Sequence, residues 1–271
     1  MKSTLLNRLP IIVLGIPAVL YILNTGGVLF QGFISLVVSL CVFEFYNLKG
    51  KENLNSSYFF GIPIALIICF FYGQYPYVDS ELILSFLLLS IIIYLLYIML
   101  SGSQKPFNNI SVVLAGTIYP AALLGSMIAL RNWDEMNGSN FTISMVITVW
   151  ICDSAAYTFG RLWGKKKLIE KVSPKKTVVG FIGGIAGAFI SFYIMNQMNF
   201  IYNSLTIIDV LILSLIVGVV GQLGDFVESM FKRDAGVKDS GKLLLGHGGV
   251  LDRFDSLIFT SPSLLIFVLY L

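Results

Sequence analysis

About nine apolar windows follow one another along this chain, each of roughly the length that a helix needs to cross a lipid bilayer. Hydrophobic residues make up 56% of the 271 positions and charged residues 12%, which is too apolar for a surface that faces water all round. The sequence therefore predicts an all-α integral membrane protein and excludes a soluble multidomain protein. The windows lie at about 9–24, 27–47, 58–75, 82–100, 111–130, 141–162, 180–202, 206–229 and 254–271.

Positive charge is segregated between alternate connections. If the nine helices alternate in direction, all of the 18 Lys and Arg residues except Arg131 fall on one side of the membrane. Positively charged connections stay in the cytoplasm. The pattern predicts a cytoplasmic N-terminus and a C-terminus on the opposite side. Most of these cations lie in the connections after the sixth and eighth windows, so we expect a site that faces the cytoplasm from the inner membrane.

No repeat or long linker divides the chain. Residues 1–140 are expected to form the first five transmembrane helices, and residues 141–271 a catalytic transmembrane region with two cytoplasmic basic loops. The three cysteines, Cys41, Cys69 and Cys152, lie within apolar windows and have neither disulfide nor zinc spacing. We expect them to be small core residues.

Four carboxylates are expected where the eighth helix ends and the ninth begins. Asp225 and Glu228 are three residues apart and so share one helical face, and Asp252 and Asp255 repeat this spacing. Carboxylate oxygens beside a basic phosphate pocket suit Mg²⁺ and leave room for a second cation. These four residues are the predicted metal ligands. An alternative remains open, in which Asp255 caps its helix and Glu228 only pairs with Lys232.

The sixth window carries polar residues on one helical stripe. Asp153, Tyr157 and Arg161 follow one another at intervals of four. Among them stand the small residues Ala156, Gly160 and Gly164, a ladder that would let two membrane helices approach closely. We expect the ladder to serve packing, whereas a buried acid such as Asp153 indicates a functional site.

The connection after this window places Ser173, Lys175, Lys176 and Thr177 just before the seventh helix. A helix N-terminus attracts anions, so these residues are candidates for binding nucleotide phosphates or a lipid headgroup. The run 165–167, three lysines, is expected to be a solvated topology signal only.

The second basic connection holds Lys232, Arg233, Lys238 and Arg253, which could neutralise phosphates, and the single histidine, His247. Among glycines, His247 could act as a general acid or base, could donate to a phosphate or sugar, or could only shape a turn. No nucleophile elbow and no phosphate loop are present. An anion transporter remains an alternative, because a buried Asp beside clustered cations also fits that function.

Two blocks of this sequence resemble the CDP-diacylglycerol synthases, or phosphatidate cytidylyltransferases. The C-terminal pattern SxxKRxxxxKDxG followed by HGGxxDRxD is matched by Ser229, Lys232, Arg233, Lys238, Asp239, Gly241, His247, Gly248, Gly249, Asp252, Arg253 and Asp255. An upstream block is matched by Asp153, Ala156, Tyr157, Gly160, Arg161, Gly164, Ser173, Pro174, Lys175, Lys176, Thr177 and Gly180, and the GDxxES element by Gly224, Asp225, Glu228 and Ser229. Leu245 replaces a customary Pro and Val179 a customary Glu. Residues 1–149 match the family only in hydropathy.

The resemblance implies a Mg²⁺-dependent transferase that joins CTP, or dCTP, to phosphatidic acid and forms CDP-diacylglycerol and pyrophosphate. A CTP-using lipid kinase is the enzymatic alternative. No nucleic-acid partner is expected, and a homodimer is possible. The candidate catalytic residues are Asp225, Asp252, Asp255, Lys232, Arg233, Lys238, His247 and Arg253. The candidate substrate-binding residues are Asp153, Tyr157, Arg161, Ser173, Lys175, Lys176, Thr177, Ser229, Asp239, Gly248 and Gly249.

Overall fold

The computed structural model describes residues 9–48, 54–77, 79–201, 205–243 and 248–270. Every named element in these ranges is a helix, and the extended pairing there consists of one isolated bridge between Lys167 and Thr177. The predicted all-α class is confirmed. In chain order the elements are α2 (Leu9–Thr25), α3 (Gly27–Leu48), α4 (Leu54–Gly73), α5 (Ser80–Leu100), α6 (Pro106–Gly116), η1 (Thr117–Leu123), α7 (Leu124–Asn132), α8 (Gly138–Trp163), α9 (Val178–Gln197), α10 (Ile207–Leu215), η2 (Ile216–Gly221), α11 (Gln222–Asp234) and α12 (Leu251–Leu269).

Each predicted apolar window overlaps a helix, but two windows contain a change of helix type. The segments η1 and η2 are π-helical turns that continue α6 into α7 and α10 into α11. Pro120 lies inside η1, where its missing N–H removes a backbone hydrogen bond. Gly218 and Gly221 lie in η2, and Cβ atoms there would come within 2.8 Å of Ile185 Cα and 2.7 Å of Thr260 Oγ1. Because these glycines have no Cβ atom, η2 can pack closely on α9 and α12.

Six stretches of the described residues are long and apolar enough to cross a membrane. Shorter apolar helices lie at Val13–Thr25 and Tyr58–Gly73. Together they establish an integral membrane protein. The six stretches are Gly27–Leu48, Glu81–Leu100, Pro106–Asn132, Gly138–Trp163, Val178–Gln197 and Ile207–Asp234.

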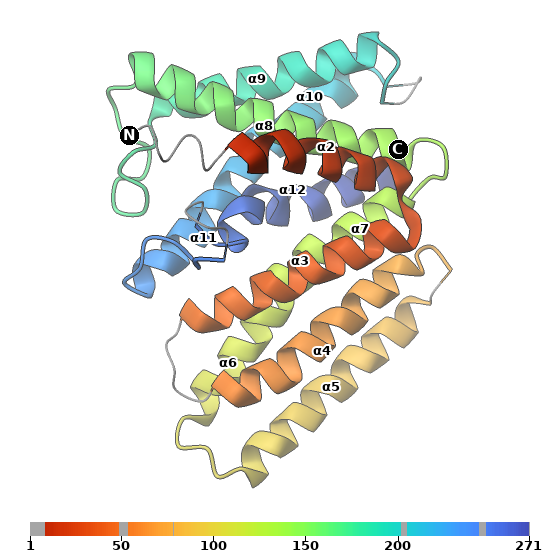
Figure 1. Ribbon diagram of the computed structural model, residues 1–271, viewed down its shortest axis with the longest axis vertical. Helices are drawn as coiled ribbons and strands as arrows, with labels where there is room; N and C mark the ends of the chain where they lie inside the picture. Colours follow the sequence, from red (N-terminus) through yellow and green to blue (C-terminus); the bar gives the residue numbers. More distant parts are fainter. Residues whose placement is uncertain (1–8, 49–53, 78, 202–204, 244–247, 271) are drawn as a thin grey trace.

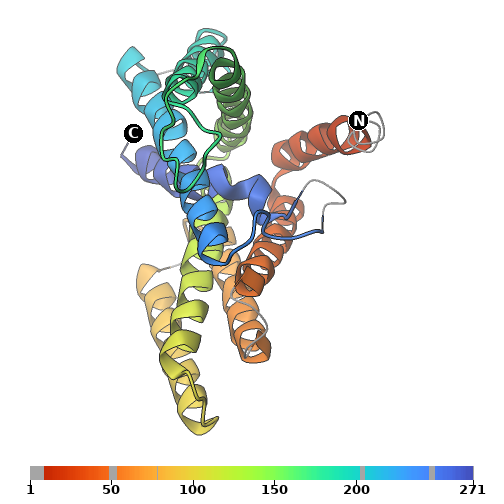
Figure 2. The same ribbon diagram turned by 90° about the vertical axis from the view of Figure 1, so that its left-hand side faces the viewer.

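The helices form two groups joined by α11 and α12 (Figures 1 and 2). One group contains α3 to α7, and the other contains α8, α9 and α10. The helix α12 packs on α7 and η1 in the first group, on α8 in the second, and on α11 and η2, and so contacts both groups. The larger of two apolar clusters includes Cys41, Cys69 and Cys152, all buried with free thiols. The prediction that the cysteines are core residues is confirmed.

Among the described residues, α8 and α9 make the most extensive contact of any helix pair, and glycine makes this contact possible. A Cβ atom at Gly180 would lie 2.7 Å from the carbonyl oxygen of Ala156, and one at Gly160 would lie 3.0 Å from Thr177 Oγ1. Such distances are too short for a side chain. The predicted packing role of the small-residue ladder is therefore confirmed, and the contact brings the start of α9 against the last turns of α8.

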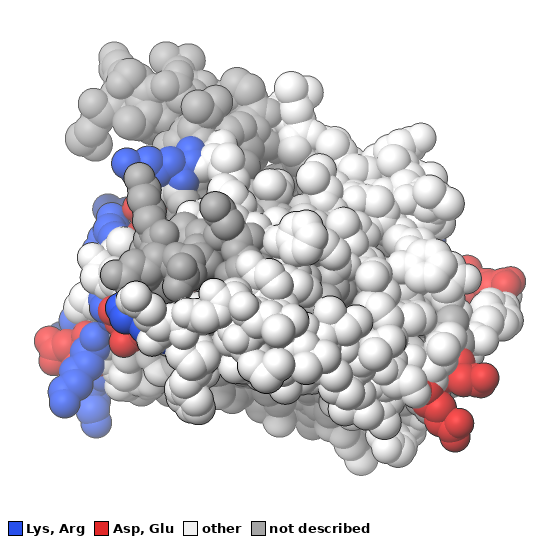
Figure 3. Space-filling view, turned by 90° about the horizontal axis from the view of Figure 1, so that it is seen from below, with Lys and Arg blue, Asp and Glu red and all other residues white. Residues whose placement is uncertain are grey.

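Charged side chains gather at two ends of the molecule, and an uncharged belt lies between them (Figure 3). On the face shown, Lys and Arg lie at one end, whereas only Asp and Glu are seen at the other. The loops after α8 and α11 lie on the same side in Figure 1, opposite the end of α12. The basic loops predicted to share one side of the membrane therefore lie together in space.

Candidate active site

A cavity of about 520 Å³ lies where α8, the loop after it and the start of α9 face α11 and the start of α12. Its walls combine acidic, basic and aromatic side chains, as a site for a charged ligand with an apolar part requires. Ten of the predicted site residues line it: Asp153, Tyr157, Arg161, Lys175, Lys176, Thr177, Asp225, Asp252, Arg253 and Asp255.

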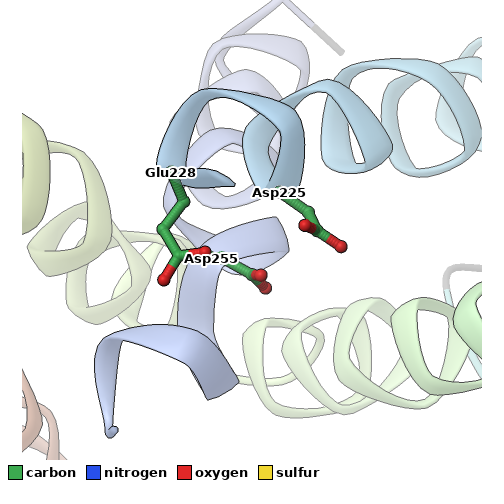
Figure 4. Close-up of side chains that lie close together, drawn as sticks. All are labelled: Asp225, Glu228 and Asp255. Carbon is green, nitrogen blue, oxygen red and sulfur yellow. The ribbon is translucent and has the colours of Figure 1, made fainter. Parts of the chain in front are cut away.

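Three carboxylates meet beside this cavity (Figure 4). Asp225 and Glu228 extend from α11 and Asp255 from α12, and one oxygen of each lies within 4.8 Å of the others. Glu228 is fully buried; its Oε2 is paired with Lys232, and its Oε1 has no hydrogen-bond partner among the described residues. Asp255 Oδ1 accepts a hydrogen bond from the backbone N–H of Ser256 at 2.7 Å. A group of oxygen donors this close fits a hard divalent cation.

Lys232 joins this cluster to the start of α12. Its ammonium group forms a salt bridge with Glu228, as the alternative interpretation of Glu228 required, and Nζ also lies 2.6 Å from Asp252 Oδ1. Because Lys232 and Glu228 occupy adjacent turns of α11, the pair follows directly from their spacing. The salt bridge is compatible with Glu228 being part of the cluster.

Asp252 lines the cavity, but its carboxylate is bound by the loop before α12 and lies outside the three-carboxylate group. Its Oδ2 accepts hydrogen bonds from Ser240 N at 3.0 Å and Gly249 N at 2.8 Å. Burial raises the pKa of Asp252, but the hydrogen bonds from Lys232 and Gly249 outweigh burial and hold it below its ordinary value. Gly248 has φ +82°, and a Cβ there would lie 2.7 Å from Asp252 Oδ2. The turn thus depends on glycine.

On the opposite wall, Lys176 reaches across the cavity to α11. Its Nζ lies 2.5 Å from Asp225 Oδ2 and 4.4 Å from the ring centre of Phe226. Thr177 caps α9, because its hydroxyl accepts a hydrogen bond from Gly180 N at 3.1 Å. Lys175 lines the cavity and is exposed. The loop therefore presents two cations at the N-terminus of a helix, as predicted.

Two further predicted residues contact the cavity's side chains. Arg161 Nη1 donates to Tyr157 Oη at 3.3 Å. Ser229 Oγ donates to Asp225 Oδ1 at 3.4 Å from the next turn of α11. Both hydrogen bonds are long; the Arg161 bond is exposed, so Arg161 can exchange its partner for a ligand, whereas Ser229 is buried.

Other predicted residues lie away from the cavity. Arg233 donates to Val172 O at 3.4 Å and to Val237 O at 3.2 Å, and so ties the end of α11 to the first basic loop. Lys238 and Asp239 are exposed. Ser173 does not line the cavity; its N–H donates to Ile169 O at 2.9 Å within the same loop. His247 and Leu245 lie outside the described residues.

Sequence comparison decides the family. A profile of the Cytidylyltransferase family matches residues 6–271. The chain belongs to this family. A phosphatidate cytidylyltransferase of Staphylococcus saprophyticus is 36% identical over 247 residues, which cover 89% of this chain and 93% of the relative. One of Bacillus subtilis is 33% identical over 250 residues, covering 90% of each chain. Membership makes this cytidylyltransferase a nucleotidyltransferase, as the resemblance implied.

Sequence reasoning missed Gln222 at this cytidylyltransferase's cavity. Its Nε2 donates to Phe181 O at 3.0 Å and thereby fixes α9 against α11. Gln222 lies three residues before Asp225, so helical spacing already placed both on one face. A search along that face for every polar residue, and not only for acids, would have found it.

Sequence reasoning also missed Glu44, which lies in α3, far from both motif blocks. Its buried carboxylate accepts hydrogen bonds from Ser240, Val250 and Leu251 in the second basic loop and α12. A signal was present, because Glu44 is the one acid in the apolar window 27–47. An acid at such a position is costly unless it has partners.

Proposed function

We propose that this protein is a phosphatidate cytidylyltransferase that uses Mg²⁺. A phosphate oxygen of phosphatidic acid attacks the α-phosphorus of CTP. The new P–O bond forms as the bond from the α-phosphorus to the bridging oxygen breaks, and pyrophosphate leaves with that oxygen. The products are CDP-diacylglycerol and pyrophosphate.

The observation that carries this proposal is the meeting of three carboxylates and two loop lysines across one cavity. Two phosphate-bearing substrates repel each other, so the reaction needs fixed positive charge and metal-binding oxygens in the same place. Lys176 contacts Asp225 directly, so both kinds of group reach one point. The names of the relatives support phosphatidate as the acceptor.

Some residues of this chain would bind the substrate phosphates, and others would hold the acidic side chains in position. Lys175, Lys176, Arg161 and Arg253 line the cavity, and they can neutralise the triphosphate of CTP and the headgroup phosphate. Lys232 holds Glu228 and Asp252 in place.

Oε1 of Glu228, which accepts no hydrogen bond from the described residues, and the closeness of Asp225 and Asp255 fit an oxygen-liganded cation. Bound Mg²⁺ would withdraw charge from the phosphoryl oxygens in the transition state. Asp252 would act on this group indirectly, through Lys232.

We further propose nine membrane crossings, with the N-terminus and both basic loops in the cytoplasm and the C-terminus on the far side. The positive charge at one end of the molecule supports this orientation (Figure 3). A cavity on that side would receive water-soluble CTP from the cytoplasm of the cell and the lipid from the inner membrane.

The test uses purified protein in detergent with phosphatidic acid, Mg²⁺ and CTP that carries ³H in the cytidine and ³²P at the γ-phosphate. The proposal predicts ³H in the lipid phase and ³²P in water as pyrophosphate, and EDTA should prevent both. In the control, diacylglycerol, which has no attacking phosphate, replaces phosphatidic acid.

The alternatives give different label patterns. A CTP-using lipid kinase would move ³²P into lipid and leave ³H in water as CDP. A transporter would move anions across a sealed vesicle without consuming CTP. Either pattern would overturn the proposal.

A further inference from the structure

Glu44 is a buried acid in the half of the chain that carries neither motif block. It lies on the last turns of α3, and only 2% of its surface is exposed. Its neighbours in the chain, Phe45 and Tyr46, are buried aromatic residues. A carboxylate in such surroundings must be compensated by hydrogen bonds.

The hydrogen-bond partners of the Glu44 carboxylate belong to the segment that leads into α12. Oε1 accepts from Val250 N at 3.0 Å, and Oε2 accepts from Leu251 N at 2.9 Å and from Ser240 Oγ at 2.8 Å. Val250 is the N-cap residue of α12 and Leu251 is its first residue. At this end of a helix, backbone N–H groups have no helical partner and the helix dipole favours an anion. Glu44 therefore caps α12 from a different helix.

The loop closes tightly over this carboxylate. A Cβ atom at Gly241 would lie 2.2 Å from Glu44 Oε1, and one at Gly249 would lie 2.3 Å from Oε2. Both positions must therefore be glycine for the loop to reach Glu44. The requirement for glycine at motif positions 241 and 249 thus comes from Glu44, a residue outside the motif.

Ser240 connects Glu44 to the cavity. Its hydroxyl donates to Glu44 and its backbone N–H donates to Asp252 Oδ2 at 3.0 Å. Asp252 in turn binds Lys232, which pairs with Glu228 of the carboxylate cluster. The position of the first turn of α12, and with it the direction of Asp252, is thus fixed from α3.

We propose that Glu44 is a positioning residue for the transfer reaction: it holds Ser240 and the start of α12 so that Asp252 and Asp255 face the cavity. This inference rests on the proposed function for its kinetic part. An amide cannot replace the carboxylate, because Gln offers one acceptor oxygen, and its NH₂ group would face a backbone donor.

The experiment compares Glu44→Gln and Glu44→Asp with the unchanged protein and with Val38→Ala. Val38 is fully buried on the same helix, so Val38→Ala weakens the packing of α3 without touching the loop. Two readouts are taken in detergent. One is kcat and KM for CTP at several Mg²⁺ concentrations, and the other is amide hydrogen exchange across residues 248–256 and across α3.

For Glu44→Gln we expect kcat to fall roughly 10- to 100-fold, as for other residues that orient a site, with a smaller change in KM for CTP. Exchange should accelerate in residues 248–256 and stay nearly unchanged in the remainder of α3. Glu44→Asp keeps the charge with a shorter reach and should recover part of kcat. Val38→Ala should lower the melting temperature and keep kcat.

Three results would overturn the inference. They are unchanged exchange at 248–256 in Glu44→Gln, a normal kcat in that variant, or an equal loss of kcat in Val38→Ala. If the unchanged protein shows no transfer, the proposed function fails, and the exchange data alone still decide whether Glu44 holds the start of α12.

Discussion

Lys176 Nζ lies 2.5 Å from Asp225 Oδ2, and this ion pair joins the loop before α9 to α11 across the cavity. The two residues are about equally exposed, at 28% of each side chain, so a ligand can reach both. The cation that would neutralise substrate phosphate is thus held by an acid of the proposed metal site. If CTP and Mg²⁺ bind as proposed, each could take over one partner of this pair.

Replacing Asp225 by Asn should abolish turnover. The change keeps the shape of the side chain but removes one negative charge from the cluster with Glu228 and Asp255. Substitution of residues that only orient metal ligands typically lowers metal affinity or activity by about 10- to 100-fold. For a residue of the cluster itself, we expect kcat to fall by roughly 100-fold or more. The assay is lipid-phase label from CTP, with membrane extraction as the control for insertion. Near-normal turnover would refute the metal assignment.

Lys176→Ala should weaken the use of CTP. Loss of one charge-assisted contact costs about 2 kcal/mol, or about 30-fold in kcat/KM. Lys166→Ala is the matched control, because this lysine belongs to the same loop but is exposed and does not line the cavity. Its kcat/KM should change by less than about twofold. Equal losses in both variants would show that only the total charge of the loop matters.

Lys232→Met should destabilise the protein. Glu228 is fully buried and Asp252 is 8% exposed, so removal of Lys232 leaves two buried carboxylates without their shared cation. Breaking such a buried pair typically lowers the free energy of unfolding by about 3–5 kcal/mol. A thermal melt in detergent measures the loss. Lys242→Met, at an exposed position of the loop that follows α11, should melt like the unchanged protein.

Acid should release the loop that Asp252 holds. Burial opposes its ionisation, but the hydrogen bonds from Lys232 and Gly249 prevail, so its pKa in the folded protein is lowered. The unfolded value is about 3.9. The stabilisation is therefore complete above that pH and is lost as the pH falls through the folded pKa. Melting temperatures measured from pH 6 downward should fall less steeply in Asp252→Asn. An identical slope would contradict this role.

Gly180→Ala should separate α8 from α9. The new Cβ would lie 2.7 Å from the carbonyl oxygen of Ala156, which is backbone and cannot rotate away. We expect a lower melting temperature and reduced turnover, because Lys176 and Thr177 precede this contact. Gly32→Ala in α3 is the control, since apart from its chain neighbours and its own helix backbone no atom of the described residues lies within 4 Å of its Cβ position. That change should be neutral or should stabilise by roughly 0.5–1 kcal/mol. A melting temperature for Gly180→Ala equal to that of Gly32→Ala would exclude the packing role.

Sequence reasoning predicted the features that depend on local spacing. The helical windows follow from apolar length, and the shared face of Asp225 and Glu228 follows from helical geometry. The direction of Asp252 could not be predicted this way. It depends on the positive φ of Gly248 and on Ser240, a partner twelve residues away. Glu44 was missed because its partners are about 200 positions distant, and spacing within a motif carries no information over that range.

The π-helical segment η2 has a consequence for the angular position of the acids. A π turn takes in more residues than an α turn, so it rotates every later residue of the helix about the helix axis. In this chain the next element is α11, with Asp225 and Glu228 on one face. Removing one residue from η2 would turn that face by about 100°. The length of η2 therefore determines the direction in which the face with Asp225 and Glu228 points around the helix axis. An insertion or deletion in η2 would alter the site without changing any of its residues.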